Sequence, residues 1–509
     1  MSAPWTDDAC SLVDAFRSGE RSPREELEAT LAAIERSDLN CFSHLDPERA
    51  LAAASAADLS LPFGGVPTAI KELDQVEGWP NREASLVFRD RRASYTSTNI
   101  QRLLARGGAV PVGQTTASEF GGLNVSVTKM NGVTHNPWRH GRTVGGSSSG
   151  SSAAVAGGLV SLATGGDGGG SIRIPAGYTG LLGMKGTYGR IPRGPHAYWS
   201  PGTVVLGCLA RSVRDAARFY DVCAGPDPRD PTSLPSEGAW ERSLGSHDLM
   251  GRRVAVIPSI GGVQLEAGVE ERVRGAAADL IAAAGLVQVD IPLELPNLAA
   301  QWMMGNLSTL LAGLGDRWPA CEDDLTQEIA FGLRLAQSMY NLDTAAVAEA
   351  KRVELQEAMA GAFDQVDFVI TATNPGPAFA ADATTSSPNG TILDQIGATK
   401  AGKLGFRGVM AGVRVSSAFY AKLPNLLIEQ ATARLPDMVT MGALTIASNV
   451  YGNPAVSIPA GLVDGLPVGM QVLSRHHTDA LLFDLALAAE RTLAWPKVAP
   501  GVAQVPASA

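Results

Sequence analysis

The sequence has few cysteines, few histidines and no long hydrophobic run, and each shortage excludes a class of protein. Its five cysteines lie far apart along 509 residues with no CxxC pair, which excludes a disulfide framework and a cysteine-ligated zinc site. The seven histidines form neither an HExxH nor an HxH pattern, so we expect no metal. No stretch reaches the roughly 18 apolar residues of a membrane-spanning helix. These absences favour a protein with reduced thiols and no membrane-spanning helix.

Charge is also scarce. Charged residues make up 18% of the chain and the net charge is -10, which argues against a broad surface for nucleic acid or anionic membranes. Hydrophobic residues make up 45%, enough for a sizeable core and too many for global disorder. Residues 1–8 lack the basic and apolar segments of a secretion signal. We therefore expect a cytoplasmic enzyme with no nucleic-acid partner and no membrane partner.

The order of predicted elements indicates an α/β fold, because short apolar runs alternate with helical patterns. We predict strands at 65–71, 109–112, 254–257, 368–370, 455–458 and 468–473. We predict helices at 22–34, 46–57, 100–105, 268–284 and 478–495. No linker divides the chain, so we predict a single large domain over residues 1–509. Within it we expect a helical segment at about 1–60, a long mobile loop at 375–390 and a loose tail at 494–509.

Glycine and serine concentrate between residues 141 and 190. Sixteen of the 56 glycines fall in these 50 residues, and serines crowd the same place. A flexible linker is one explanation, but apolar stretches at 153–156 and 159–160 argue against it. A phosphate-binding loop is another, but neither GxxxxGK[ST] nor GxGxxG after a strand can be placed here. We predict that the fold needs special backbone conformations or close backbone approach in this segment.

Two short patterns suggest other hydrolase families. A GxSxG match at 146–150 would make Ser148 the nucleophile of an α/β-hydrolase, with His476 or His477 as its base. No clear β-branched strand leads into this pentapeptide. An SxxK pattern joins Ser126 to Lys129, but the SDN and KTG motifs of penicillin-recognising enzymes are missing.

A third arrangement covers far more of the chain, because GGSSSG at 145–150 is followed at a fixed distance by DGGGSIRIP at 167–175. Further motifs accompany this pair, and they are GGVPTAIK at 64–71, HNPW at 135–138, GCLARSVRD at 207–215, AGPDPRD at 224–230, NPAVSIP at 453–459 and GLPVG at 465–469. Together they resemble the amidase signature family over most of the chain. The resemblance implies a twisted mixed β-sheet flanked by helices.

The resemblance also implies a Ser–cis-Ser–Lys triad. Ser171 is then the nucleophile, Ser147 is the bridging serine after a cis peptide bond, and Lys71 is the base. The family requires no metal and no cofactor. The backbone N–H groups of the run Gly168, Gly169 and Gly170 are expected to form an oxyanion hole. Asp167 and Arg173 flank this run and are expected to pair and hold the turn.

The chemistry needs Lys71 to be neutral. A lysine with the ordinary pKa of about 10.4 is almost entirely charged at pH 7, but burial can lower the pKa by about 3–5 units. The apolar stretch 66–70 is able to bury its stem, and lysines are scarce, with eight among 41 basic residues. Glu72 stands where the family usually has aspartate, and alternation along a strand turns it away from Lys71. Gly166 and Gly168 also depart from the family pattern, which leaves the loop around Asp167 looser.

The resemblance implies an amidohydrolase that cleaves the C–N bond of a small-molecule amide through a seryl acyl-enzyme, with esterase side activity. By position in the family, the segment 119–124, with Gly121, Gly122 and Leu123, and the loop 375–390 should line the acyl pocket. A second family role is the glutamine-hydrolysing amidotransferase A-type subunit, which needs partner subunits. A non-catalytic binding scaffold is the alternative of another class. The sequence leaves the substrate open and is compatible with a homodimer.

Overall fold

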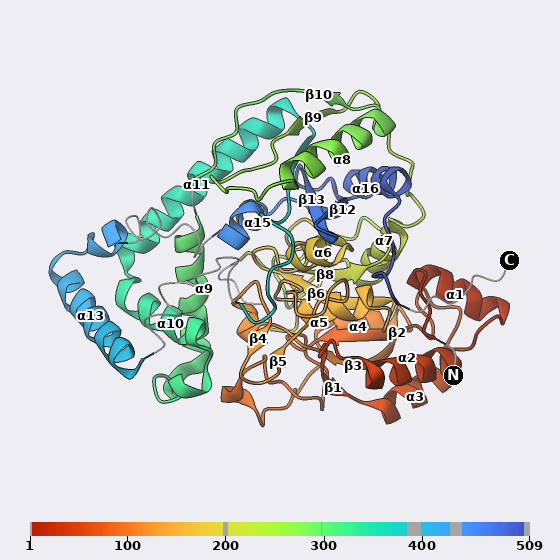
Figure 1. The fold of residues 1–509 in the computed structure, drawn as a ribbon, viewed down its shortest axis with the longest axis horizontal. Coiled ribbons are helices and arrows are strands. Elements are labelled where there is room, and N and C mark those ends of the chain that lie inside the picture. The colour runs from red at the N-terminus through yellow and green to blue at the C-terminus, as the bar shows by residue number, and fades with distance from the viewer. Residues whose placement is uncertain (1–2, 197–201, 297, 384–398, 428–439, 503–509) are drawn as a thin grey trace.

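An 11-stranded sheet forms the centre of the computed structural model, which describes residues 3–196, 202–296, 298–383, 399–427 and 440–502 (Figure 1). In order across the sheet, the strands are β1 (Phe42–Leu45), β3 (Val110–Thr115), β2 (Pro67–Lys71), β6 (Leu162–Asp167), β8 (Val205–Ala210), β7 (Leu182–Lys185), β12 (Ala455–Val463), β13 (Leu466–Ser474), β11 (Phe368–Ala372), β9 (Arg253–Val256) and β10 (Val287–Gln288). A separate two-stranded sheet pairs β4 (Val127–Thr128) with β5 (Gly132–Val133).

The large sheet is mixed. β2 runs parallel to both β3 and β6, and β9 runs parallel to β10 and β11. The remaining pairs, including β6 with β8 and β12 with β13, are antiparallel. The predicted α/β fold with a mixed sheet is therefore confirmed.

Helices cover the sheet and extend beyond it. The helices are α1 (Ala9–Ser18), α2 (Pro23–Arg36), α3 (Pro47–Ser55), α4 (Thr98–Ala105), α5 (Ser149–Ala156), α6 (Arg173–Thr179), α7 (Val213–Cys223), α8 (Val269–Ala284), α9 (Ala299–Leu314), α10 (Gln327–Met339), α11 (Leu342–Gln365), α13 (Lys400–Phe419), α15 (Thr440–Tyr451) and α16 (Asp479–Leu493). Short 3-10 turns are η1 (Leu86–Phe88), η2 (Glu119–Gly121), η3 (Gly315–Arg317) and η4 (Glu322–Asp324). Helices α9, α10, α11 and α13 stand at one side of the sheet as a helical layer (Figure 1).

Local sequence explains where the N-terminal helices begin. The predicted capping box at α2 is present, because the Ser22 hydroxyl accepts from the Glu25 backbone and Glu25 reaches back to the Ser22 backbone. Asp46 caps α3 in front of a proline at the first helical position. The segment 1–60, which we predicted to be helical, holds these helices but also contributes the edge strand β1. Of the predicted tail at 494–509, residues 503–509 lie outside the described part of the chain.

Two apolar clusters cover the two faces of the sheet. Helices α1, α4, α7, α8 and α16 contribute to one, and α2, α3, α5 and α6 to the other. Along β2, Ile70 belongs to the first cluster and Ala69 to the second. Because side chains alternate along a strand, Lys71 shares the face of Ala69, which is the face of α5. The pleat of β2 therefore directs Lys71 toward the glycine- and serine-rich turn that begins α5.

Parallel pairing brings two strand ends to one edge. β2 pairs with β6 through Thr68 with Leu162 and Ala69 with Ala163, so Lys71 and Asp167 lie at the carboxyl ends of adjacent strands. In α/β sheets this edge is where ligands commonly bind. Within the described residues, no helix is long and apolar enough to cross a membrane. The same part of the chain holds no group of three or more His, Cys, Asp or Glu side chains able to hold a metal ion.

Candidate active site

Lys71 is buried at the end of β2 and contacts two serines. The residue is only 3% exposed. Its Nζ donates to the hydroxyls of Ser147 and Ser148, each at 2.9 Å. The carbonyl of Gly166 also accepts from Nζ at 3.4 Å. Burial lowers the pKa of Lys71 to about 8, although the negative charges of Asp74, Asp167 and Glu72 oppose that shift. The lysine is thus poised to exchange a proton with a hydroxyl.

Ser147 lies in the turn that precedes α5. The peptide bond between Gly146 and Ser147 is cis, as the resemblance implies. The close approach of the chain explains the glycine, because a Cβ at position 146 would lie 2.6 Å from the Ser118 hydroxyl and 2.8 Å from the backbone nitrogen of Val125. Ser147 itself is 2% exposed. The turn therefore holds the Ser147 hydroxyl against the Lys71 amine.

Ser171 lies between β6 and α6, 6% exposed. Its carbonyl accepts from the backbone N–H of Ser148 at 3.3 Å, which joins the two serine-bearing turns. Among the described residues, no hydrogen bond links the Ser147 and Ser171 hydroxyls directly. Catalytic hydrogen bonds are often long without substrate and tighten when it binds. The structure thus brings Lys71, Ser147 and Ser171 into one site.

Asp167 and Arg173 form the predicted pair, and it is buried and bidentate. Arg173 donates to the two carboxylate oxygens of Asp167 at 2.9 and 3.0 Å, with both side chains fully buried. Burial alone would raise the pKa of Asp167, but the Arg173 charge and hydrogen bonds hold it well below its usual range. Arg173 also donates to Gln471 on β13 and Asn449 on α15. The pair therefore ties the turn that carries Ser171 to the other half of the sheet.

The glycine run before Ser171 is shaped by the same carboxylate. The Gly170 N–H donates to Asp167 at 2.7 Å, so it is not available to an oxyanion while this bond exists. Gly170 has φ +126°, and a Cβ there would lie 2.3 Å from the Thr445 hydroxyl, so only glycine fits. In the described residues, no acceptor takes the N–H of Gly168 or Gly169. The proposed oxyanion hole is thus narrowed to those two of the three predicted glycines.

The three residues predicted to bind substrate do not all approach the serines. Gly121 does, because a Cβ there would lie 3.4 Å from the Ser147 hydroxyl. A Cβ at Gly122 would instead lie 2.8 Å from the Ile329 side chain on α10. Leu123 packs on the apolar cluster formed largely by α9 and α10. Of the loop predicted at 375–390, residues 384–390 lie outside the described part of the chain.

The competing patterns do not assemble into sites. Ser148 contacts Lys71, whereas the His476 ring contacts the Tyr451 carbonyl at 2.7 Å. No hydrogen bond of the described residues joins Ser148 to His476 or His477. Lys129 donates to the carbonyl of Asp323 at 2.8 Å, and no hydrogen bond of the described residues joins it to Ser126. The geometry therefore favours the lysine-based arrangement over both alternatives.

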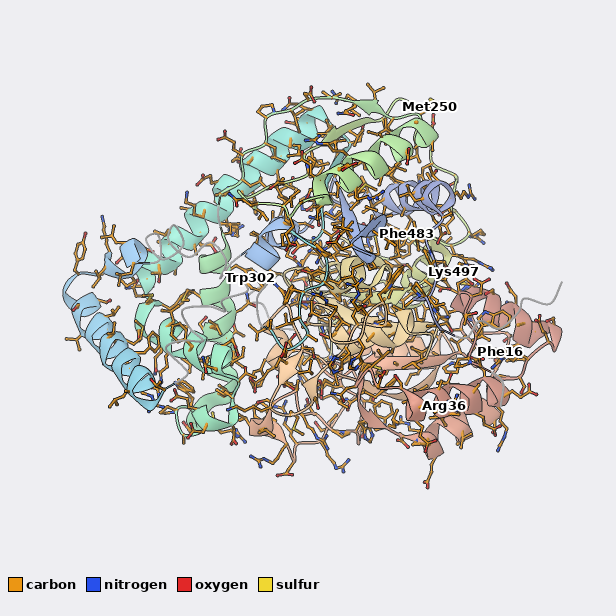
Figure 2. All side chains as sticks on the ribbon, viewed as in Figure 1. Phe16, Arg36, Met250, Trp302, Phe483 and Lys497 are labelled. Carbon is orange, nitrogen blue, oxygen red and sulfur yellow. The ribbon has the colours of Figure 1, made fainter. Side chains whose placement is uncertain are left out.

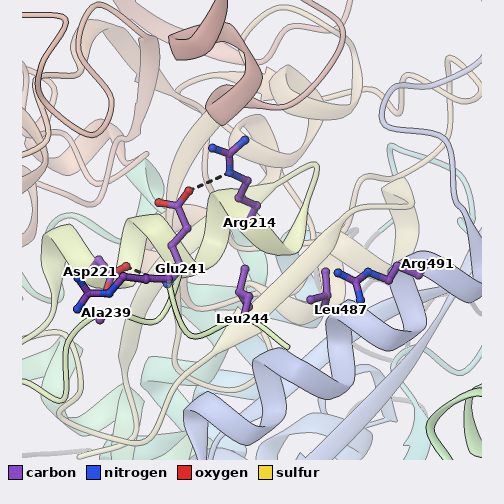
Figure 3. Close-up of a pocket in the computed structure, with 8 residues that line it drawn as sticks. Arg214, Asp221, Ala239, Glu241, Leu244, Leu487 and Arg491 are labelled. Carbon is purple, nitrogen blue, oxygen red and sulfur yellow. Dashed lines mark hydrogen bonds and ion pairs between the residues drawn. The ribbon is translucent and has the colours of Figure 1, made fainter. Parts of the chain in front are cut away.

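A cavity of about 600 Å³ lies elsewhere, between α7, α16 and the segment 239–244 (Figure 3). It is lined by Arg214, Asp221, Ala239, Glu241, Arg242, Leu244, Leu487 and Arg491. Glu241 is already paired with Arg214 at 2.9 Å, the contact drawn in Figure 3, and with Arg218. None of the predicted site residues lines this cavity, so it plays no part in the site described above.

Three residues near the site escaped sequence analysis. Thr164 accepts from the Lys71 backbone N–H at 2.9 Å and donates to Asp74 at 2.8 Å. Trp302 comes from α9, where that helix approaches the centre of the molecule (Figure 2). A Cβ at Gly169 would lie 2.8 Å from its ring, and its Nε1–H is buried without a partner in the described residues. The third residue, Asp74, follows Lys71 by three positions, and this proximity is the one sequence signal that could have found it.

Comparisons with known proteins agree on one family. A model of the amidase family matches residues 25–399. The A-type subunit of the glutamyl-tRNA(Gln) amidotransferase of Salinispora tropica is 32% identical over 95% of this chain and 96% of its own length. The solved structure of 6-aminohexanoate cyclic dimer hydrolase is 26% identical with a TM-score of 0.81, covering 98% of this chain and 100% of that one. A bacterial aryl acylamidase shares the fold, with a TM-score of 0.82 at 24% identity over 96% of this chain and 97% of its own.

Proposed function

The chain belongs to the amidase family, and on that basis we propose that it hydrolyses carboxylic amides through an acyl-enzyme on Ser171. The observation that carries the proposal is the contact between the buried Lys71 amine and the Ser147 hydroxyl, in the turn joined to Ser171. A serine hydroxyl needs an adjacent base to become a nucleophile. A lysine with a pKa of about 8 supplies one near neutral pH.

The proposed reaction moves one proton through the two serines. The Ser171 hydroxyl attacks the carbonyl carbon while its proton passes to Ser147, which gives its own proton to neutral Lys71. The tetrahedral oxyanion accepts from the N–H groups of Gly168 and Gly169. Lys71 then returns the proton through Ser147 to the departing amine, and the C–N bond breaks. Water repeats the sequence on the acyl-enzyme and releases the acid, and an ester would enter the same path.

Replacing Ser148 by alanine tests whether it is the nucleophile or only a neighbour of Lys71. The variant loses one hydrogen bond to the lysine, so we expect hydrolysis to fall about tenfold, the scale of a single net interaction of about 1.4 kcal/mol. Fluorophosphonate should still label Ser171, as mapped by peptide mass spectrometry. If the wild type is instead labelled at Ser148 and the variant is not labelled at all, the nucleophile is Ser148.

Two substrate classes fit the proposal, and the relatives favour the second. The first is a small apolar amide, which the side chains of Trp302 and Ile446 beside Gly169 support. The second is glutamine, hydrolysed by an amidotransferase A-type subunit. The curated relatives, which are named as A-type subunits of glutamyl-tRNA(Gln) amidotransferase, support this alternative more directly than they support a small-molecule amidase. The name of those relatives also implies partner subunits, which this chain would then need.

A product assay separates the two classes. The chain alone is given an apolar anilide or glutamine, and release of arylamine or ammonia is measured. An apolar amidase should release arylamine, and Trp302→Ala should raise KM about tenfold because a large aromatic contact surface is lost. Trp302→Phe, which keeps an aromatic ring, is the matched control. Ammonia release from glutamine that appears only with partner subunits would establish the amidotransferase role. If the protein hydrolyses no amide and no ester, the non-catalytic binding scaffold is the hypothesis that remains.

A further inference from the structure

Asp74 lies directly behind the proposed base. Its backbone N–H donates to the Lys71 carbonyl at 2.8 Å, which closes the turn that ends β2. The carboxylate points inward, since the residue is only 7% exposed. Its two oxygens accept from the Thr164 hydroxyl at 2.8 Å and from the Asn99 amide at 3.4 Å. A carboxylate is therefore held in the interior by two neutral donors.

Thr164 connects this carboxylate to the lysine. The Thr164 hydroxyl accepts from the Lys71 backbone N–H at 2.9 Å while it donates to Asp74. The chain of hydrogen bonds thus runs from Lys71 through Thr164 to Asp74, across the junction of β2 and β6. Burying a carboxylate is costly unless it is paired, yet no ion pair of the described residues includes Asp74. The cation that it faces is Lys71, whose amine is turned toward Ser147 and Ser148.

We propose that Asp74 is a positioning residue that fixes the Lys71 backbone through Thr164, and that its charge sets the pH at which Lys71 becomes a free base. The inference rests on the proposed function, in which Lys71 is the base. It deepens that function by naming the group that regulates the base. Asp74 touches no reacting atom, because its contacts go to Thr164, Asn99 and the Lys71 backbone.

The other carboxylates around Lys71 already have cationic or backbone partners. Asp167 is paired with Arg173. Glu72, which follows the last residue of β2, accepts from the Ala117 backbone at 2.6 Å and the Asn131 amide at 2.8 Å. Burial raises the pKa of the Cys223 thiol on α7, and the charge of Asp74 raises it further while Arg102 and Arg106 lower it. Among the described carboxylates near Lys71, Asp74 is therefore the one with neither a cationic partner nor a backbone donor.

The direction of the effect follows from charge. Burial lowers the pKa of Lys71, and among the carboxylates that oppose this shift Asp74 acts most strongly. Burial also raises the pKa of Asp74 itself, while Thr164 and Lys71 favour its ionised form. Removing the negative charge makes protonated Lys71 less favourable. Lys71 should then become neutral at a lower pH.

The test is the pH dependence of fluorophosphonate labelling of Ser171 in the full-length chain, which needs no knowledge of the substrate. Asp74→Asn keeps the shape of the side chain and removes the charge, so the midpoint of the rising limb should move down by about one pH unit. Glu72→Gln is the matched control, because it removes a buried carboxylate next to Lys71 in the chain whose charge acts on Lys71 less strongly than that of Asp74. It should shift the midpoint less.

Two variants of Thr164 test its hydrogen bonds to Lys71 and Asp74 separately. They also keep the inference testable if Asp74→Asn does not fold. Thr164→Val removes the donor that stabilises the Asp74 charge, so its midpoint should also fall. Thr164→Ser keeps the hydroxyl and should retain the wild-type midpoint. An unchanged midpoint in both Asp74→Asn and Thr164→Val, even with slower labelling, would show a purely structural role and overturn the inference. Wild-type protein that is not labelled at Ser171 would overturn the proposed function itself.

Discussion

Ser171→Ala should lose amide hydrolysis by a factor on the order of 10⁵ or more, the scale seen when a serine hydrolase loses its nucleophile. The reason is that the proposed acyl-enzyme forms on the Ser171 oxygen, which alanine lacks. The variant should keep its fold, since the side chain removed is small. Hydrolysis of the best amide found for the wild type gives the rate, and mass spectrometry after fluorophosphonate treatment gives the adduct.

The control for this variant is Ser149→Ala. Ser149 begins α5 and its hydroxyl donates to the Gly145 carbonyl at 2.7 Å, so it belongs to the same glycine-rich turn without touching Lys71. Its loss should change hydrolysis far less than the loss of Ser171. A Ser171→Ala enzyme that retains near wild-type turnover would refute the acyl-enzyme proposal.

Lys71→Met should lower kcat/KM by about 10²–10⁴-fold, the usual contribution of a general base. Methionine fills the space of the buried stem but cannot take a proton. In the wild type, kcat/KM should rise with pH through about 8, because the free base forms as pH passes the pKa of Lys71. The variant should lose this rising limb, and a full pH profile of both proteins measures it.

Lys185→Met is the matched control. Lys185 is also fully buried, burial lowers its pKa to about 7, and its amine donates to the carbonyls of Asn453 and Gly186. It contacts no serine of the proposed triad. The variant should be less stable, because the carbonyls lose their donor, but its pH profile should still rise near 8. If the rising limb survives in Lys71→Met and disappears in Lys185→Met, the group that titrates is Lys185, and Lys71 is not the base.

Strong local patterns predicted much of the fold. The capping box at Ser22 placed the start of α2 correctly, and the apolar run before Lys71 became β2. In contrast, β6 was not predicted, since Leu162–Asp167 contains two glycines and a buried aspartate. It is a strand because β2 and β8 pair with it on either side. Such pairing depends on distant segments, which a local pattern does not contain.

The helical layer illustrates the same limit. Helices α9, α10 and α11 cover most of residues 299–365, yet none of them was predicted. The apolar residues of α9 and α10 pack on Phe88, Phe120 and Leu123 from the N-terminal half of the chain, whereas those of α11 pack with β9 and β11. The layer brings Trp302 against the glycine run before Ser171. One part of the surroundings of the proposed site therefore comes from a segment that carries no recognisable motif.

The sequence by itself determined the family, the α/β class and the three residues of the proposed triad, because glycine turns and a lysine after an apolar run leave a pattern of fixed spacing. Only the tertiary structure decided which groups surround that lysine. It turned Glu72 away, engaged the Gly170 N–H with Asp167, and placed Asp74 and Thr164 behind Lys71. These contacts join β2, β6 and distant turns, and their distances and burial, which set the charge of the lysine, exist only once the sheet has formed.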